Sequence, residues 1–246
     1  EKWLLRYNPA KCKVMHVGHN LDTKYSMKDE AGMLELQVVA EEKDLGVLFT
    51  QDLKPGRQCM AAAAKASRII GLVRRNFRDL DKRDFLLIYK AYIRPHLEYC
   101  IQAWSPYLEW DMEVLERVQR SATRLLSGFA RYGYEDRLRK LGITTLRKRR
   151  ERGDLIEVYR IMSGREKIEK TQFFRPANNE YCLRGHSLKI RKERSRLDIR
   201  KHSFSQRVVG SWNRLPQKVV DAQSINQFKN LLDRHWQDMD AAGYTA

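Results

Sequence analysis

The sequence predicts a mainly α-helical protein with a small β region near its N-terminus. Short alternating or β-branched runs all fall before Pro55. After that residue, apolar side chains recur at helical spacing through most of the chain. With 42% apolar residues in a length of 246, the chain can bury a sizeable core in one or two domains.

The N-terminal region is expected to contain several short strands. Proline disfavours a helical conformation in the residue before it, so Asn8 and Pro9 mark a boundary. Residues 11–17 then alternate in the manner of a strand, and Pro55 and Gly56 end the region. Further strands are predicted near residues 24–27, 34–39 and 45–49.

Helical spacing predicts the elements that follow. Asp81 is expected to be the N-cap of a helix that runs through Ile93, and Pro95 should kink or end that helix. Ser163 and Gly164 are expected to close a later one. The other predicted helices cover residues 57–79, 109–127, 134–141 and 144–162.

The C-terminal part is predicted to be less regular. Residues 165–203 carry much charge and little periodicity, which is typical of a loose or partly disordered segment. A final ordered unit is expected over residues 204–236, with Ser224 as the cap of its last helix and Trp212 and Trp236 as core anchors.

The net charge indicates a polyanionic partner. Lys and Arg total 48 against 31 Asp and Glu, which leaves +17. Nucleic acid is the first candidate, an acidic lipid surface the second and an acidic protein the third. The sequence has no run of about 18 apolar residues, so no membrane span is predicted. The four cysteines are scattered without a CxxC pair, which favours a reducing compartment, the nucleus or the cytoplasm.

The stretch KCKVMHVGH, residues 11–19, has the composition of a zinc site. In a strand, however, Cys12 and His16 stand roughly 13 Å apart at about 3.3 Å per residue, whereas zinc ligands lie about 2 Å from the ion. We therefore predict no metal site there. His19 is expected to lie at the surface.

A series of longer motifs resembles the reverse transcriptases of non-LTR (LINE-type) retrotransposons, particularly the chicken-repeat and jockey-like groups. WLLRYNPAKCKVMHVG (3–18) is similar to a helix, turn and strand of their last palm motif, and EEKDLGVLF (41–49) to their palm-to-thumb transition. Their thumb resembles IYKAYIRPHLEYCIQAWSP (88–106) and LERVQRSATRLL (115–126). The segments after the thumb resemble YEDRLRKLGITTLRKRRERGDLIEVYRI (134–161), RGHSLKI (184–190) and SWNRLPQKVV (211–220).

The resemblance implies a division into the end of a palm (1–54), a helical thumb (55–130) and a basic C-terminal region with a terminal helical unit (131–246). It also implies a partner, the upstream fingers and palm of the parent chain. The family's catalytic Asp-Asp pair, which holds Mg²⁺, precedes this region, and the chain contains no Asp-Asp pair. We therefore expect no cofactor bound by this chain and no polymerisation by it alone.

Lys11 occupies the position of the lysine that the family is proposed to place near the incoming nucleotide's phosphates. In an intact enzyme it would be an auxiliary catalytic residue, because a cation there stabilises charge that develops during phosphoryl transfer. The alternative is a solvated lysine beside a turn.

Phosphate contacts are predicted at clusters of basic side chains, because a duplex is gripped through its backbone. The alternative for each cluster is a solvated face, with intrahelical pairs to Glu151 and Asp154 in the central one. The candidate nucleic-acid-binding residues are Arg74, Arg75, Arg147, Lys148, Arg149, Arg150, Lys189, Arg191, Lys192, Arg194, Arg196, Arg200 and Lys201.

The aromatic side chains Tyr89, Tyr92, Tyr99 and Trp104 are predicted to pack in the core, with base stacking as the alternative. The resemblance and the net charge are consistent with two functions. The first is a C-terminal fragment of an RNA-directed DNA polymerase that retains binding of RNA, DNA or an RNA–DNA hybrid. The second is a non-enzymatic protein-interaction protein derived from such an element. No P-loop, nucleophile elbow or GxGxxG motif points to another enzyme.

Overall fold

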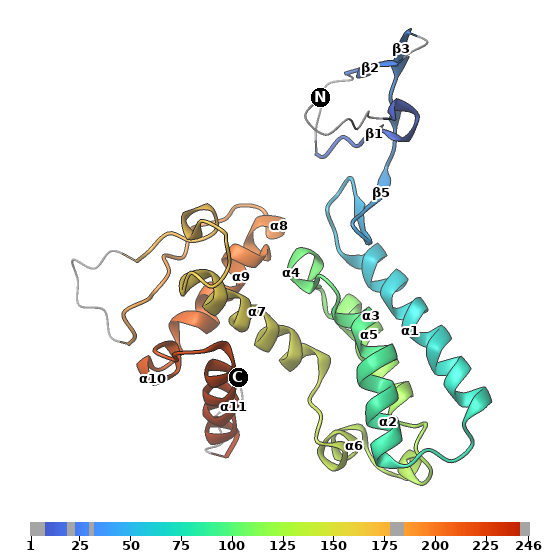
Figure 1. The fold of residues 1–246 in the computed structure, drawn as a ribbon, viewed down its shortest axis with the longest axis vertical. Helices are drawn as coiled ribbons and strands as arrows, with labels where there is room; N and C mark the ends of the chain where they lie inside the picture. The colour runs from blue at the N-terminus through green and yellow to red at the C-terminus, as the bar shows by residue number, and fades with distance from the viewer. Residues whose placement is uncertain (1–7, 19–22, 30–31, 178–184, 242–246) are drawn as a thin grey trace.

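The computed structural model describes residues 8–18, 23–29, 32–177 and 185–241. It confirms the predicted fold class, because the chain is mainly helical and its few small strands lie near the N-terminus. Figure 1 shows these strands at one end of the molecule and the helices in two groups below them. The helix expected within residues 1–7 lies outside the described residues.

The strands described in the N-terminal region form two-stranded pairs. A 3₁₀ turn, η1 (Pro9–Lys11), precedes the first strand. The parallel pair is β1 (Lys13–Val14) with β4 (Gln37–Val38); the antiparallel pairs are β2 (Ser26–Asp29) with β3 (Gly32–Glu35), and β5 (Glu41–Asp44) with β6 (Val47–Thr50). The strand predicted over residues 11–17 is therefore much shorter than expected, and β5 was not predicted.

The β5–β6 hairpin corrects the prediction that a strand begins at residue 45. Leu45 and Gly46 have φ values of +44° and +88°, so they form the turn. Positive φ at both central residues matches the turns that follow the right-handed twist of a hairpin. The side chain of Leu45 projects into solvent at 84% exposure.

The strands before β6 bury few apolar side chains. Met33 and Val38 are 69% and 58% exposed, and all four residues of β3 are exposed. In the described part of the chain, the hydrophobic core begins only at Val47. This region therefore has no core of its own, and its sheet faces are open to a further segment or partner.

The helices of the first group lie between residues 56 and 122, and the fourth of them was not predicted. They are α1 (Gly56–Asn76), α2 (Lys82–Ile88), α3 (Arg94–Glu98), α4 (Ile101–Trp104) and α5 (Glu109–Ala122). The N-cap prediction is confirmed, since the Asp81 side chain accepts a hydrogen bond from the Asp84 amide at 2.7 Å. Helix α5 ends earlier than predicted, before a turn.

Pro95 lies close to an interruption of the regular α-helix. A π-helical turn, η2 (Tyr89–Ile93), separates α2 from α3, and Pro95 lies in the first turn of α3. Proline lacks an amide hydrogen and crowds the preceding turn, so the chain widens locally instead of continuing as a regular α-helix. The chain stays helical to Glu98, so the helical segment does not end at Pro95.

The first core joins these helices to β6 and to the chain beyond residue 130. Helix α1 packs on α5 and α3, and buries Cys59 and Ala66 completely. Phe85 and Tyr89 are also fully buried and stack at 5.6 Å. Leu146, at the start of the long helix α7, belongs to this core too.

The remaining helices are α6 (Tyr134–Leu141), α7 (Leu146–Met162), α8 (Asp198–Lys201), α9 (Phe204–Asn213), α10 (Gln217–Val220) and α11 (Ile225–Ala241). Thr145 caps α7, and the helix ends at Ser163 and Gly164 as predicted. The predicted cap of α11 is confirmed, because Ser224 Oγ accepts a hydrogen bond from the Gln227 amide at 3.1 Å.

A second core fills the space between α7, α9, α10 and α11. Trp212 and Phe228 are fully buried in it, which confirms Trp212 as an anchor. Trp236 is only partly buried at its edge. Since the buried residues of α7 divide between the two cores, with Leu146 in the first and Leu155 in the second, this helix links the two groups.

The described residues of the segment 165–203 correct the prediction of a loose region. Phe174 and Ile190 are each 2% exposed and belong to the second core. Pro176 pairs with Ile190 in an antiparallel bridge. Buried side chains spaced too irregularly for a helix or a strand hold this segment, so its lack of periodicity does not indicate a lack of order.

His186 should make the stability of the C-terminal group depend on pH. Its ring is 2% exposed, Nε2 lies 2.9 Å from the Trp212 carbonyl oxygen, and Nδ1 has no hydrogen-bond partner. A carbonyl only accepts hydrogen bonds, so Nε2 carries the proton of the neutral ring. Burial lowers the pKa of His186, because a second proton on Nδ1 would be charged and unpaired.

The unfolded chain therefore binds this proton more readily than the folded one, and stability is lost as pH falls below about 6.5. We expect His186→Gln, which can still donate to Trp212 O, to lose less unfolding free energy than the wild type between about pH 7.5 and about pH 5.5. Urea titrations at both pH values measure this difference. An equal loss in the two proteins would rule out His186 as the source.

Candidate nucleic-acid interface

The segment between Ile190 and α9 carries a set of unpaired cations. Their side chains are exposed and make no hydrogen bond or ion pair with the residues described in the structure. Glu193, an acidic residue within this segment, already pairs with Arg175 at 3.2 Å and with Arg200 at 3.9 Å. We call this set the basic segment: Arg191, Lys192, Arg194, Arg196 and Lys201.

The fold holds the basic segment at both ends. The Ile190 amide donates to Asn213 Oδ1 at 2.9 Å, and Asn213 Nδ2 donates back to the Ile190 carbonyl at 2.7 Å. At the other end, His202 stacks on Tyr107 with ring centroids 4.4 Å apart. The cations therefore project from an anchored stretch of backbone, which limits the entropy lost when they contact a ligand.

Two further predicted phosphate-binding residues of this region, Lys189 and Arg200, already make contacts within the chain. Arg200 pairs with Glu193 and donates to Ser205 Oγ at 3.2 Å. Lys189 is partly buried and also interacts within the chain. Only part of the predicted cluster is therefore available to an external anion without breaking an internal contact.

Arg74 and Arg75 lie in the last turn of α1, exposed and without a side-chain partner among the described residues. Figure 1 shows this end of α1 far from α8 and the basic segment. The two clusters are therefore not parts of one compact patch.

The cluster on α7 is instead paired with other helices. Arg149 Nη2 donates to Glu98 Oε2 of α3 at 3.0 Å. Arg147 pairs with Glu109 of α5 at 3.3 Å, and Lys148 pairs with Asp240 of α11 at 2.6 Å. Arg152, next to the cluster, makes two hydrogen bonds to Asp233 of α11 at 2.7 and 2.8 Å.

These contacts connect α7 to three neighbouring helices. The intrahelical pairs expected for this cluster do not form, because Glu151 accepts a hydrogen bond from Ser211 at 2.6 Å and Asp154 binds Arg207. Arg150 is buried at 5% exposure. Phosphate binding by Arg147, Lys148, Arg149 and Arg150 stays a prediction, and for the paired residues it competes with an existing ion pair.

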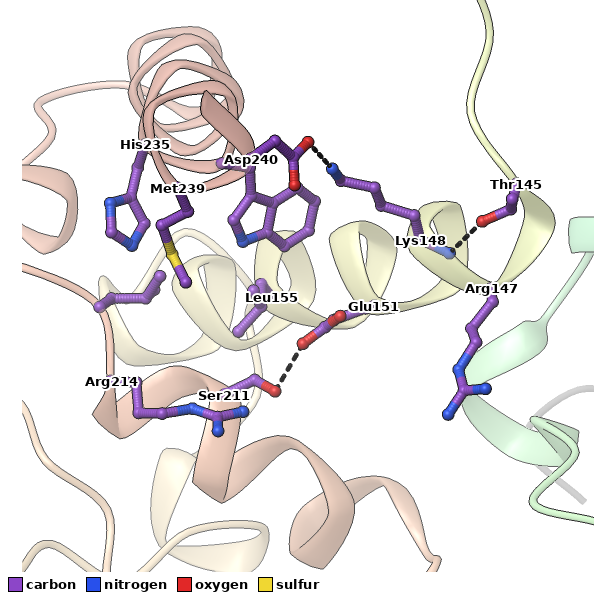
Figure 2. Close-up of a pocket in the computed structure, with 12 residues that line it drawn as sticks. Thr145, Arg147, Lys148, Glu151, Leu155, Ser211, Arg214, His235, Met239 and Asp240 are labelled. Carbon is purple, nitrogen blue, oxygen red and sulfur yellow. Dashed lines mark hydrogen bonds and ion pairs between the residues drawn. The ribbon is translucent and has the colours of Figure 1, made fainter. Parts of the chain in front are cut away.

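A pocket of about 750 Å³ lies between α7 and α11, beside this cluster (Figure 2). Lys148 lies 5.7 Å from the ring centroid of Trp236, and Figure 2 shows its amine directed to Asp240. Arg214, on the opposite wall, is exposed and unpaired among the described residues. An aromatic ring beside cations in one cavity suits a planar, negatively charged ligand such as a nucleotide.

Lys11 ends the 3₁₀ turn of η1, and its side chain is exposed with no partner in the described part of the chain. Nothing holds its amine in place in this structure, so its auxiliary catalytic role stays a prediction for an intact enzyme.

The suspected zinc stretch forms no cluster in the described residues. Cys12 Sγ lies 3.4 Å from the Asn8 carbonyl oxygen, and the His16 ring is 6.1 Å from the Tyr25 ring. His19 lies outside the described part. In residues 8–18, 23–29, 32–177 and 185–241, no three His, Cys, Asp or Glu side chains come together as metal ligands, and no helix is long and apolar enough to cross a bilayer.

The aromatic prediction is half correct. Tyr89 and Trp104 are buried in the first core, but Tyr92 and Tyr99 are 62% and 56% exposed. The π-helical turn changes the register of the chain, so Tyr92 falls on the solvent side. The Tyr99 hydroxyl donates to the Leu45 carbonyl at 2.9 Å and fixes the β5–β6 hairpin to the helices.

Sequence reasoning missed a buried polar network in the first core. Gln119 is fully buried; its Nε2 donates to Tyr134 Oη at 2.8 Å and to the Thr144 carbonyl at 3.0 Å, and Tyr89 Oη donates to its Oε1. Burial raises the pKa values of Tyr89 and Tyr134, so both stay protonated. Glu116 accepts from Tyr134 and completes the network. A glutamine on the apolar face of α5 was the available signal.

Burial also suppresses the reactivity of Cys59. Its thiol is fully inaccessible, and desolvation raises its pKa to about 12. It is therefore a core side chain and not a nucleophile or ligand.

Comparisons of the sequence and the structure with known protein families, curated proteins and solved structures find no match.

Proposed function

We propose that the chain is the C-terminal part of an RNA-directed DNA polymerase of a non-LTR retrotransposon, and that its own role is to bind RNA, DNA or their hybrid. The observation that carries the binding proposal is the basic segment, five exposed cations that have no partner among the described residues and lie on an anchored backbone. Cations that the fold leaves unpaired are free to replace the counter-ions of a phosphate backbone.

The resemblance of the motifs listed above to palm and thumb segments supports the polymerase origin. On this proposal, β1–β6 complete a palm and α1–α5 form the thumb, with the C-terminal helices behind it. A polymerase thumb grips duplex through its backbone and needs positive charge more than base-reading side chains.

The open N-terminal strands favour a partner for the β region. Met33, Leu34 and Val38 are exposed on strands that lack a core of their own. On the proposal, the upstream fingers and palm of the parent chain cover them. Uncovered strand edges of this kind also promote aggregation.

The same observation supports the second candidate function, protein–protein contact by a chain derived from such an element. In that case a separate protein, rather than the parent chain, would cover the strands, and the positive charge would be residual.

Fluorescence anisotropy with labelled RNA–DNA hybrid, duplex DNA and single-stranded RNA, across a salt series, tests the proposal. We expect log Kd to depend linearly on the logarithm of the salt concentration, with a slope that corresponds to several phosphate contacts. Weak binding at every salt concentration, together with a stable complex with a protein partner, would favour the second function.

A further inference from the structure

Arg150 of α7 is a buried cation that forms no direct ion pair with the residues described in the structure. The residue is 5% exposed, and neither Nη1 nor Nη2 has a hydrogen-bond partner in the structure. Burial lowers the pKa of the guanidinium, but arginine stays protonated at any physiological pH. An unpaired buried charge is strongly unfavourable, so its retention calls for an explanation.

The carboxylates on the same helix are already occupied. Asp154 binds Arg207 at 2.8 and 2.9 Å, and Glu151 accepts a hydrogen bond from Ser211 at 2.6 Å. Neither carboxylate lies within ion-pair distance of Arg150 in the described structure.

The carboxylates of α5 do not serve Arg150 either. Glu116 accepts hydrogen bonds from the Leu146 amide at 3.1 Å and from Tyr134. Asp111 is 6% exposed, and burial raises its pKa toward the neutral form. None of these carboxylates forms a direct ion pair with the guanidinium among the described residues, and Glu116 and Asp154 attract it only from a longer distance.

Arg150 lines a pocket of about 280 Å³ between the loop after α4 and helices α5, α7 and α9. Arg147 stands on the same wall, and its pair with Glu109 is exposed, so water and salt screen it. The pocket is open to solvent but too small for a duplex. The polar side chains of its lining that bear on an anion are Arg147, Arg150, Glu151, Asp154, Arg207 and Ser211.

We propose that this pocket binds a phosphate monoester and that Arg150 is its principal ligand. A guanidinium can donate two parallel hydrogen bonds to a phosphate. The Arg150 Nη atoms are covered in this structure, so the side chain has to turn toward the pocket, which Arg147 also lines, to bind the ligand. The inference rests on the proposed function. The monoester is the terminal phosphate of a nucleic-acid strand or the phosphate of a free nucleotide. The interior of a strand is too large to enter so small a space.

Thermal unfolding in inorganic phosphate and in a nucleoside monophosphate tests the site with the full chain. We expect the Tm of the wild type to rise with the concentration of either ligand, because a ligand that binds only the folded state stabilises it. Arg150→Met should lose this shift. Without ligand its Tm should equal or exceed that of the wild type, since methionine fills the site without an unpaired charge.

Arg150→Lys is the second variant. It keeps the charge but loses the two-point geometry, so we expect phosphate affinity to fall by at least about tenfold. It also decides the question if Arg150→Met does not fold. Wild-type phosphate affinity in either variant overturns the proposal.

Anisotropy with a single-stranded oligonucleotide that carries a 5′-phosphate or a 5′-hydroxyl separates the two sources. Tighter binding of the phosphorylated strand, lost in Arg150→Lys, assigns the pocket to strand ends. If both strands bind equally while a mononucleotide still raises the Tm, the pocket takes free nucleotides. If the wild type binds phosphate through Arg150 but binds no nucleic acid at any salt, the pocket stands and the proposed function fails.

Discussion

Reversing the charge of Arg191, Lys192, Arg194 and Arg196 to glutamate is expected to abolish most nucleic-acid affinity at physiological salt. These side chains are exposed and unpaired within the described structure, so each is free to contact one phosphate. Each lost phosphate contact lowers the slope of log Kd against log salt by about 1, so the variant should lose up to about 4. Anisotropy on an RNA–DNA hybrid across a salt series measures both quantities.

A control variant separates local contact from overall charge. Lys90, Arg124, Lys140 and Lys218 are exposed residues outside the predicted clusters. Their conversion to glutamate gives a protein with the same net charge as the first variant. We expect its salt slope to stay close to that of the wild type. Equal losses in the two variants would mean that only the overall field attracts nucleic acid, and that the basic segment is a solvated face.

Among the substitutions considered, Arg207→Met should lower the free energy of unfolding the most. Arg207 binds the buried Asp154 through two hydrogen bonds at 2.8 and 2.9 Å, and a terminal nitrogen also reaches the Gln102 carbonyl at 3.3 Å. Removal of the arginine leaves a carboxylate that is 7% exposed without its partner. Breaking a buried pair from one side costs about 3–5 kcal/mol. Urea unfolding measures the change.

The double variant Asp154→Leu, Arg207→Met gives the comparison. Removal of both charges leaves no unpaired carboxylate, so the double variant should be more stable than Arg207→Met alone. The single variant Asp154→Leu completes the comparison. If the unfolding free energy that the double variant loses equals the sum of the losses in Arg207→Met and Asp154→Leu, the two side chains do not stabilise each other. Circular dichroism of the folded state checks that each variant keeps its helices.

The helices could be predicted because their signals are local. The predicted span of α6 agrees with the structure, and the caps at Asp81 and Ser224 were recognised from side-chain type alone. The short strands were less predictable. Pairs such as β1 with β4 depend on residues far apart in the chain, and the region lacks the buried face that normally fixes the alternation of a strand.

The sequence alone does not show which of the predicted basic residues are paired with carboxylates. The Arg-rich run on α7 and the basic segment look alike in the sequence, but the first meets carboxylates from three other helices, whereas the second pairs with no carboxylate among the described residues. The acidic residues that decide this, such as Glu98 and Asp233, lie 51 and 81 positions away from their partners. Only the fold brings them together. The order in residues 165–177 and 185–203 was missed for the same reason.

The position of α7 has a consequence for how the chain opens. Leu146 at its start belongs to one core and Leu155 further along belongs to the other, while the first two turns of the helix form ion pairs with α3, α5 and α11. Its central amides can exchange with deuterium only when both helical groups come apart. They should therefore be among the slowest in the molecule, while the amides of β1–β4 exchange early through local opening.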